Sequence, residues 1–142
     1  MSMAGAQKIA PMAEPETQRR SPGVAAGFAF AGWLVPGLGH FLAGRRGRGA
    51  IYFLIVAAMV ITGFLQRGYV FSPHFKDAFS LLGFLADIGT GVFYFTAKTF
   101  EIGGPDIARA AGDYGTRFIA TAGVLNVLIA LDAYSISIGE KD

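Results

Sequence analysis

The residue of this sequence with the clearest chemical potential is Asp87, an acid in the middle of a long apolar run. A carboxyl group in such a position can relay protons or bind a cation, alone or together with His40 or Asn126. It can also act as a polar clasp that holds neighbouring helices together. We favour the clasp, because a single acid in an unbroken helix offers little of what transport requires.

Asp87 also constrains how its own run is packed. An Asp at the centre of a membrane helix costs about 2.5 to 3.5 kcal/mol, and the large apolar side chains of residues 78–97 return roughly 3 to 5 kcal/mol. Gly83, Asp87 and Gly91 lie four residues apart and therefore share one helix face. We predict that this face packs against protein, where its glycines allow a close approach.

The last apolar run carries a matching stripe of small and polar residues. Its members are Thr116, Ala120, Gly123, Asn126, Ala130 and Ala133. Gly123 would let the backbone of the other helix come close, and Asn126 could donate a hydrogen bond to Asp87. We predict that the two faces pack together through this bond. Together these residues form a candidate helix-packing or ion site.

Three arginines in the turn GRRGRG, residues 44–49, form a second candidate site. Arg45, Arg46 and Arg48 could face and hold anionic lipid headgroups, at about 1 kcal/mol for each basic residue near the surface. They could also simply anchor the chain, because basic residues mark the cytoplasmic side of membrane proteins. We favour anchoring.

The sequence carries no pattern typical of catalytic or metal sites. It has no cysteine, which excludes disulfides, thiolate zinc sites and cysteine-bound iron–sulfur clusters. His74 lacks a cluster of ligands at metal spacing, His40 is more typical of a packing or interfacial histidine, and Asp132 can reach the membrane surface. No HExxH, phosphate-binding loop or Ser-His-Asp arrangement is present. We therefore expect no enzyme, no metal and no cofactor.

The elements that carry these residues are predicted from four apolar runs. Hydrophobic residues make up 53% of the chain and charged residues 15%, against about 25% charged residues in soluble domains. Because an unpaired backbone is not tolerated in lipid, helix is the expected conformation. We predict an all-α integral membrane protein with hydrophobic helices at residues 24–43, 50–66, 78–97 and 116–136.

Other segments complete the predicted organisation. Residues 1–22 are polar and contain three prolines, so we expect a disordered tail before a single membrane domain at residues 23–139. Pro105 suits the start of a helix, which predicts a short interfacial helix near residues 105–111. A net charge of +2 gives no support for a nucleic-acid partner. The expected partners are the lipid bilayer and other membrane subunits or further copies of the chain.

The first run contains a hairpin motif with recognisable relatives. Pro36 and Gly37 are followed by Gly39, two aromatic rings and the arginine turn, which predicts a helix kinked or re-entrant at Pro36. This hairpin resembles those of many small bacterial membrane proteins, including the two-transmembrane-helix domain family. With Tyr114-Gly-Thr, Ala122-Gly-Val-Leu-Asn126 and Leu131-Asp-Ala-Tyr134, the chain looks like an uncharacterised bacterial family that joins such a hairpin to two further helices. The resemblance covers most of residues 30–139 and implies no established activity.

The basic residues bear on orientation in the membrane. If all four runs cross, each side holds six of the twelve Lys and Arg residues. If residues 24–43 instead form a re-entrant hairpin broken at Pro36, the division becomes nine against three and agrees with the positive-inside rule. Such a broken backbone would need burial against the other helices. We favour four spans, and in both arrangements we predict that residues 45–48 are cytoplasmic.

No motif assigns an activity. Small size and the lack of catalytic patterns favour a non-catalytic, multi-pass protein of the bacterial inner membrane. It would be an accessory or scaffold subunit of a membrane complex, or a small homo-oligomer. A small proton or cation conductor built around Asp87 is the first alternative. An anionic-lipid-binding membrane protein is the second.

Overall fold

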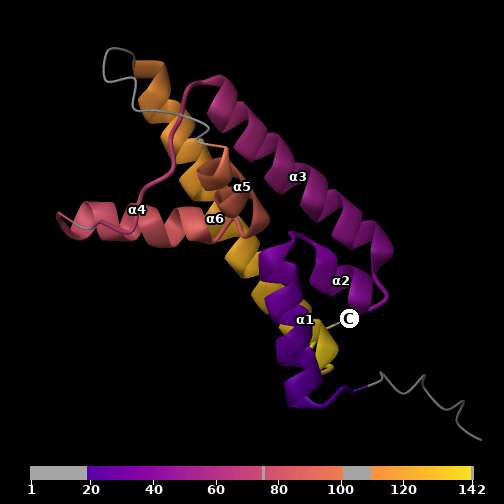
Figure 1. Cartoon of the computed structure of the whole chain (residues 1–142). Helices are drawn as coiled ribbons and strands as arrows, with labels where there is room; N and C mark the ends of the chain where they lie inside the picture. The colour runs from indigo at the N-terminus through magenta and orange to yellow at the C-terminus, as the bar shows by residue number, and fades with distance from the viewer. Residues whose placement is uncertain (1–18, 75, 101–109, 142) are drawn as a thin grey trace, which may run out of the picture.

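The computed structural model describes residues 19–74, 76–100 and 110–141, and this part of the chain is all-α (Figure 1). Its six helices are α1 (Pro22–Leu34), α2 (Leu38–Leu42), α3 (Arg46–Leu65), α4 (Ala78–Ile88), α5 (Val92–Thr99) and α6 (Ala110–Ser137). The all-α prediction is confirmed. Residues 1–18 of the predicted tail lie outside the described residues, as do residues 101–109, which hold most of the short helix predicted at 105–111.

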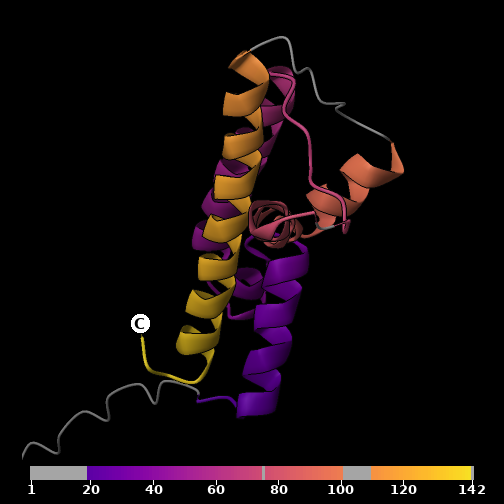
Figure 2. The ribbon, with the colours of Figure 1, turned by 90° about the vertical axis from the view of Figure 1, so that its left-hand side faces the viewer.

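The longest helix, α6, is the element on which most of the others pack (Figures 1 and 2). Its 28 residues rise about 42 Å. Helices α1, α2, α3 and α4 all contact it. The residue of α6 that each helix contacts therefore shows where that helix lies along the long axis of the bundle.

Helices α1 and α2 form a first hairpin against the C-terminal half of α6. The hairpin begins beside the last turn of α6, where the Arg20 N–H donates to the Ser137 carbonyl at 3.0 Å. Helix α1 ends at Leu34, just before Pro36, which has no N–H to continue a helix. The prediction of a break at Pro36 within residues 24–43 is confirmed.

The return path of this hairpin runs close beside α1. Gly37 has a φ of 79°, a left-handed conformation that reverses the chain and that glycine adopts at little cost. Gly39 then lies against the Phe28 carbonyl of α1 and against Ala133 of α6. Helix α2 therefore heads back toward the end of the bundle from which α1 came.

Helix α3 runs antiparallel to α6 along most of its length. Val60 packs in a core cluster with Ala122 and Ile129. One turn further on, Gly63 lies against the Gly115 carbonyl, close to the start of α6. Helix α3 covers the predicted run 50–66 almost completely and begins four residues earlier, because the last glycines of the arginine turn are already helical.

The third apolar run is two helices and not one. Helices α4 and α5 meet at a bend of 109°, so the prediction of a continuous helix at residues 78–97 is wrong. The bend has local causes. The Thr90 hydroxyl donates to the Asp87 carbonyl at 2.6 Å, and Gly91 has a φ of 62°, which no α-helix can include.

Helices α4 and α5 form a second hairpin on the other half of α6. The chain enters it through the extended segment 68–72, where the Tyr69 N–H donates to the Thr116 hydroxyl near the start of α6 at 3.2 Å. It leaves through α5, whose Lys98 ammonium donates to the Ser72 hydroxyl at 2.7 Å. This hairpin therefore starts and ends toward the N-terminal end of α6, opposite the first.

An ionised cap starts helix α4. The carboxylate of Asp77 accepts hydrogen bonds from the backbone N–H and the hydroxyl of Ser80, both at 2.7 Å. The backbone bond is the largest cause of the lowered pKa of Asp77. Because Asp77 is exposed and charged, α4 begins at the outside of the bundle and runs inward from there (Figure 1).

Two helices are long and apolar enough to cross a membrane. They are α3 and the stretch Asp113–Ser137 of α6, and the bent pair α4 and α5 would be a third only if both helices formed one span. Helix α1, with 13 residues, is shorter than the roughly 20 residues that a span needs. The described residues thus hold two to three candidate spans, where the sequence predicted four.

Gly123 tests the close packing of α4 on α6. A Cβ at Gly123 would collide with the Ala86 carbonyl, whereas a Cβ at Gly27 of α1 meets nothing within 4 Å. We expect Gly123→Ala to lower the free energy of unfolding by about 2 kcal/mol, because overpacking displaces backbone. Gly27→Ala, the matched control, should leave stability unchanged or raise it by up to about 1 kcal/mol. Thermal unfolding in detergent measures both, and equal transition temperatures would contradict this packing.

Candidate functional site

The tips of the two hairpins meet at Asn126, near the middle of α6. Its Nδ2 donates to the Trp33 carbonyl in the last turn of α1 at 2.8 Å, and to the Gly89 carbonyl at the end of α4 at 2.9 Å. A broken helix leaves carbonyls without an intrahelical donor, so one fully buried amide serves both breaks. We call Trp33, Ile88, Gly89, Gly91 and Asn126 the hairpin junction.

Two further contacts close the hairpin junction. The indole N–H of Trp33 donates to the Ile88 carbonyl at 3.2 Å. Gly91 approaches the carbonyls of Trp33 and Leu34 so closely that a Cβ would collide with them. Because a helix C-terminus carries partial negative charge, two such ends can face each other only with donors between them. The amide of Asn126 and the indole of Trp33 are those donors.

The predicted hydrogen bond between Asp87 and Asn126 is wrong. Asn126 directs its amide nitrogen to the two junction carbonyls. Asp87 is also fully buried, but its Oδ2 accepts from the Phe71 N–H at 2.7 Å. Asn126 therefore bonds the ends of two broken helices, whereas Asp87 bonds the segment that precedes α4.

The glycines predicted for a common seam have different neighbours. Gly123 lies against the Ala86 carbonyl of α4, on the helix expected to pack there. Gly83 faces the ring of Phe71, and Gly91 faces α1. The close approach of α4 to α6 at Gly123 thus lies in the last turn of α4, and the bend that follows points Gly91 toward α1.

Asp87 holds the extended segment 68–72 in place. Its Oδ2 binds the Phe71 N–H, whereas its Oδ1 is buried without a hydrogen-bond partner among the described residues. The Tyr94 hydroxyl donates to the Phe71 carbonyl at 3.2 Å, and Lys98 bonds the same segment. An extended backbone inside an apolar bundle has no intrahelical partners, and these side chains supply them. Asp87 is a clasp for the segment before α4.

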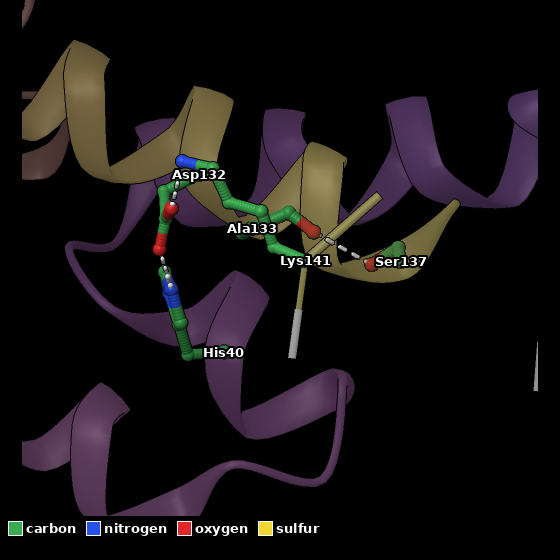
Figure 3. Close-up of polar contacts among 5 residues, drawn as sticks. All are labelled: His40, Asp132, Ala133, Ser137 and Lys141. Atoms are coloured by element: carbon green, nitrogen blue, oxygen red, sulfur yellow. Dashed lines mark hydrogen bonds and ion pairs between the residues drawn. The ribbon is translucent and has the colours of Figure 1, made fainter. Parts of the chain in front are cut away.

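A second polar group joins α2 to the end of α6 (Figure 3). The Nε2 of His40 lies 3.1 Å from Asp132 Oδ2, and the Lys141 ammonium donates to Asp132 Oδ1 at 3.0 Å. His40 is fully buried, with its ring edge-on to Tyr52 of α3 at 4.8 Å between centroids. The group therefore ties the first hairpin to both long helices.

This pair was not predicted from the sequence, where His40 is typical of a packing residue and Asp132 can reach the membrane surface. The two lie 92 positions apart, so no local spacing links them. The signal that could have found the pair is the presence of each ionisable group in an apolar run. Such groups generally have a partner inside the membrane.

The arginines of the turn 44–49 lie around the start of α3. Arg46 and Arg48 are exposed and Arg45 is half-buried, and the first turn of α3 contains no acidic side chain. Their orientation toward lipid headgroups stays a prediction. In the described part of the chain, no three His, Asp or Glu side chains come together as metal ligands.

Comparison with known proteins places the chain in a family. The model of DUF6677, a family of unknown function, matches residues 27–142. The chain belongs to this family. No curated protein and no solved structure matches it. Membership in DUF6677 agrees with the predicted resemblance to an uncharacterised family, while the likeness to the two-transmembrane-helix domain family stays a prediction.

Removing the amide of Asn126 tests the hairpin junction. Asn126→Ala leaves the carbonyls of Trp33 and Gly89 without their donor in a dry interior, so we expect stability to fall by about 2 kcal/mol or more. Trp33 emission should shift to longer wavelength as water enters. Thr121→Ala is the matched control, because its exposed hydroxyl bonds only the Arg117 carbonyl of its own helix. An Asn126 variant as stable as this control would contradict the junction.

Proposed function

We propose that the protein is a non-catalytic integral membrane protein of the cell inner membrane, an accessory or scaffold subunit of a membrane complex. The observation that carries this proposal is how the buried polar side chains are used. Asn126, Asp87 and His40 each bond a group of the chain's own fold, while one further polar atom of each side chain is buried without a partner among the described residues. Hydrogen bonds of this kind, made within the fold, brace the structure, and this supports a scaffold role.

In this proposal α3 and α6 cross the bilayer as antiparallel spans. The 20 residues of α3 rise about 30 Å, which is the thickness of the hydrocarbon core. The two hairpins enter from opposite sides and end at the hairpin junction near mid-depth. Lipid does not tolerate broken backbone, but a protein interior that supplies hydrogen bonds does, and the contacts of the junction supply them.

This placement puts residues 19–22, the turn 44–49 and the end of α6 on one side of the membrane. Arg20 supports the grouping, because it bonds the Leu42 carbonyl at the end of α2 as well as the end of α6. By the sequence, that side holds seven of the twelve Lys and Arg residues. These seven include the three arginines of the turn 44–49, next to the start of α3. By the positive-inside rule, this side is the cytoplasmic one.

The outward surface suits a protein that works within the bilayer. Large apolar side chains are exposed along both long helices; they include Ile51, Leu54 and Ile61 of α3 and Val124, Leu128 and Leu131 of α6. Acyl chains, a partner subunit or a second copy would cover these faces. The proposal of an accessory or scaffold role rests on such lateral contacts.

Introduced cysteines test the proposed topology against a clean background, because the chain has no cysteine. We expect Ser21→Cys, Arg46→Cys and Lys141→Cys, all at exposed positions, to react with an impermeant maleimide only from the cytoplasmic side. His74→Cys, also exposed, should react only from the periplasm. Labelling of positions 46 and 74 from the same side would refute the topology. Recovery of the protein from the supernatant without detergent would refute the membrane placement itself.

A proton or cation conductor is the second candidate function, and one observation favours it. Asp87 Oδ1 and Asn126 Oδ1 are buried without hydrogen-bond partners close to the meeting hairpins. The bend after α4 also puts Asp87 beside a broken helix, the kind of place where transporters bind ions. An unbroken helix around Asp87 would speak against conduction, but the helix is broken directly after Asp87.

Asp87→Asn separates the two candidates. Asparagine keeps an oxygen for the Phe71 N–H but cannot carry a proton, so the fold should persist. For the scaffold we expect no proton or sodium flux by the wild type in proteoliposomes, and the same co-purifying membrane partners or oligomer for both proteins. Wild-type flux that Asp87→Asn abolishes would establish conduction. A strictly monomeric wild type without partners in mild detergent would contradict the scaffold.

A further inference from the structure

The arginine turn forms a step at the proposed cytoplasmic end of the bundle. Helix α1 extends into the bundle for 13 residues, about 20 Å, whereas α2 extends back toward the same end for only five residues, about 7.5 Å. The turn after α2 therefore lies deeper than the start of α1, as Figures 1 and 2 show. We call the arginines at this level, Arg45, Arg46 and Arg48, together with Arg20, the basic step.

Arg20 connects the two levels of the step. Its guanidinium lies 4.6 Å from the ring centroid of Phe28 and donates to the Leu42 carbonyl at 3.0 Å. Three residues later, the Arg45 N–H donates to the His40 carbonyl at 2.8 Å. The side chain of Arg20 is thus held beside the turn and against Phe28 of α1, and we call the first two turns of α1 the wall of the step.

The depth of the basic step matches that of lipid phosphates. If α3 spans the hydrocarbon, Arg46 at its start lies at the boundary with the headgroups. The polar layer is roughly 5 to 8 Å thick on each side, and the start of α1 rises through it. Phe41, Leu42 and Ile51 are exposed next to the turn, where acyl chains would lie.

Among the described residues, basic side chains outnumber acidic ones at this end. The described residues here carry six cations, Arg19, Arg20, Arg45, Arg46, Arg48 and Lys141, and two acids, Asp132 and Glu140. Of these two acids, Asp132 bonds His40 and Lys141. A guanidinium group is well suited to a phosphate, because it can donate two parallel hydrogen bonds to it.

We propose that the basic step is a binding site for the headgroup of an acidic phospholipid. The lipid phosphate sits on the arginines of the turn, beside the wall formed by the start of α1, and the acyl chains run down past Phe41 and Ile51. This inference rests on the membrane placement proposed above. It goes beyond charge-based anchoring, because it requires a lipid that stays bound when the bulk bilayer is removed.

Native mass spectrometry of protein released from vesicles of equal parts phosphatidylglycerol and phosphatidylcholine tests the site. We expect the wild type to retain phosphatidylglycerol well above its share of the vesicle. The double variant Arg45→Gln with Arg46→Gln should lose about thirtyfold of that preference, since each of the two basic residues near the surface contributes about 1 kcal/mol.

The control removes two charges from the opposite end of the bundle. Lys76→Gln with Arg117→Gln changes two exposed residues there and should keep the preference of the wild type. Equal retention of both lipids by the wild type, or equal losses in the two double variants, would overturn the site. A wild type that fails to enter vesicles of either lipid would instead refute the membrane placement, so the two failures are distinguishable.

Discussion

Each break in an apolar helix leaves backbone groups that need partners, and this fold depends on how that need is met. Two of the four apolar runs are broken, and the amide of Asn126 donates to a carbonyl from each break. Without that amide, two helix ends of the same partial charge would face each other in a dry interior. The position of both hairpins, and with it the path of the chain, follows from this shared donor.

Glycines allow the helix ends to come close enough for the shared donor to reach both carbonyls. The two hydrogen bonds, at 2.8 and 2.9 Å, would be lost if a side chain pushed either backbone away. Gly91 lets the second hairpin tip touch the carbonyls of α1, and Gly123 lets the end of α4 settle on α6. Asp87 meets the same need elsewhere, since it supplies an acceptor to the N–H of Phe71 in an extended segment. The costly polar residues of the interior thus compensate the breaks.

How much of this could be predicted from the sequence depends on the kind of signal. Pro36 removes a donor in any context, so the first break was predictable. The break at residues 89–91 was not, because glycine in a membrane helix serves close packing as often as bending. The cost of inserting Asp87 implied its burial, but its partner is a backbone group, which no side-chain pattern reveals. That His40 and Asp132 each need a partner could be inferred from their place in apolar runs, but not that they pair with each other, because 92 residues separate them.

The helix breaks also change how the Lys and Arg residues are divided between the two sides of the membrane, and this division bears on orientation. Four crossing runs divide the basic residues six to six, which leaves orientation undetermined. In the proposed placement, where both hairpins end at mid-depth, the division is seven to five. Three of the seven directly adjoin the start of α3, which would be the first full span. The first span usually dominates orientation. In the proposed placement, the hairpin junction keeps residues 24–43 from crossing, and the arginine turn would then orient the span that follows it.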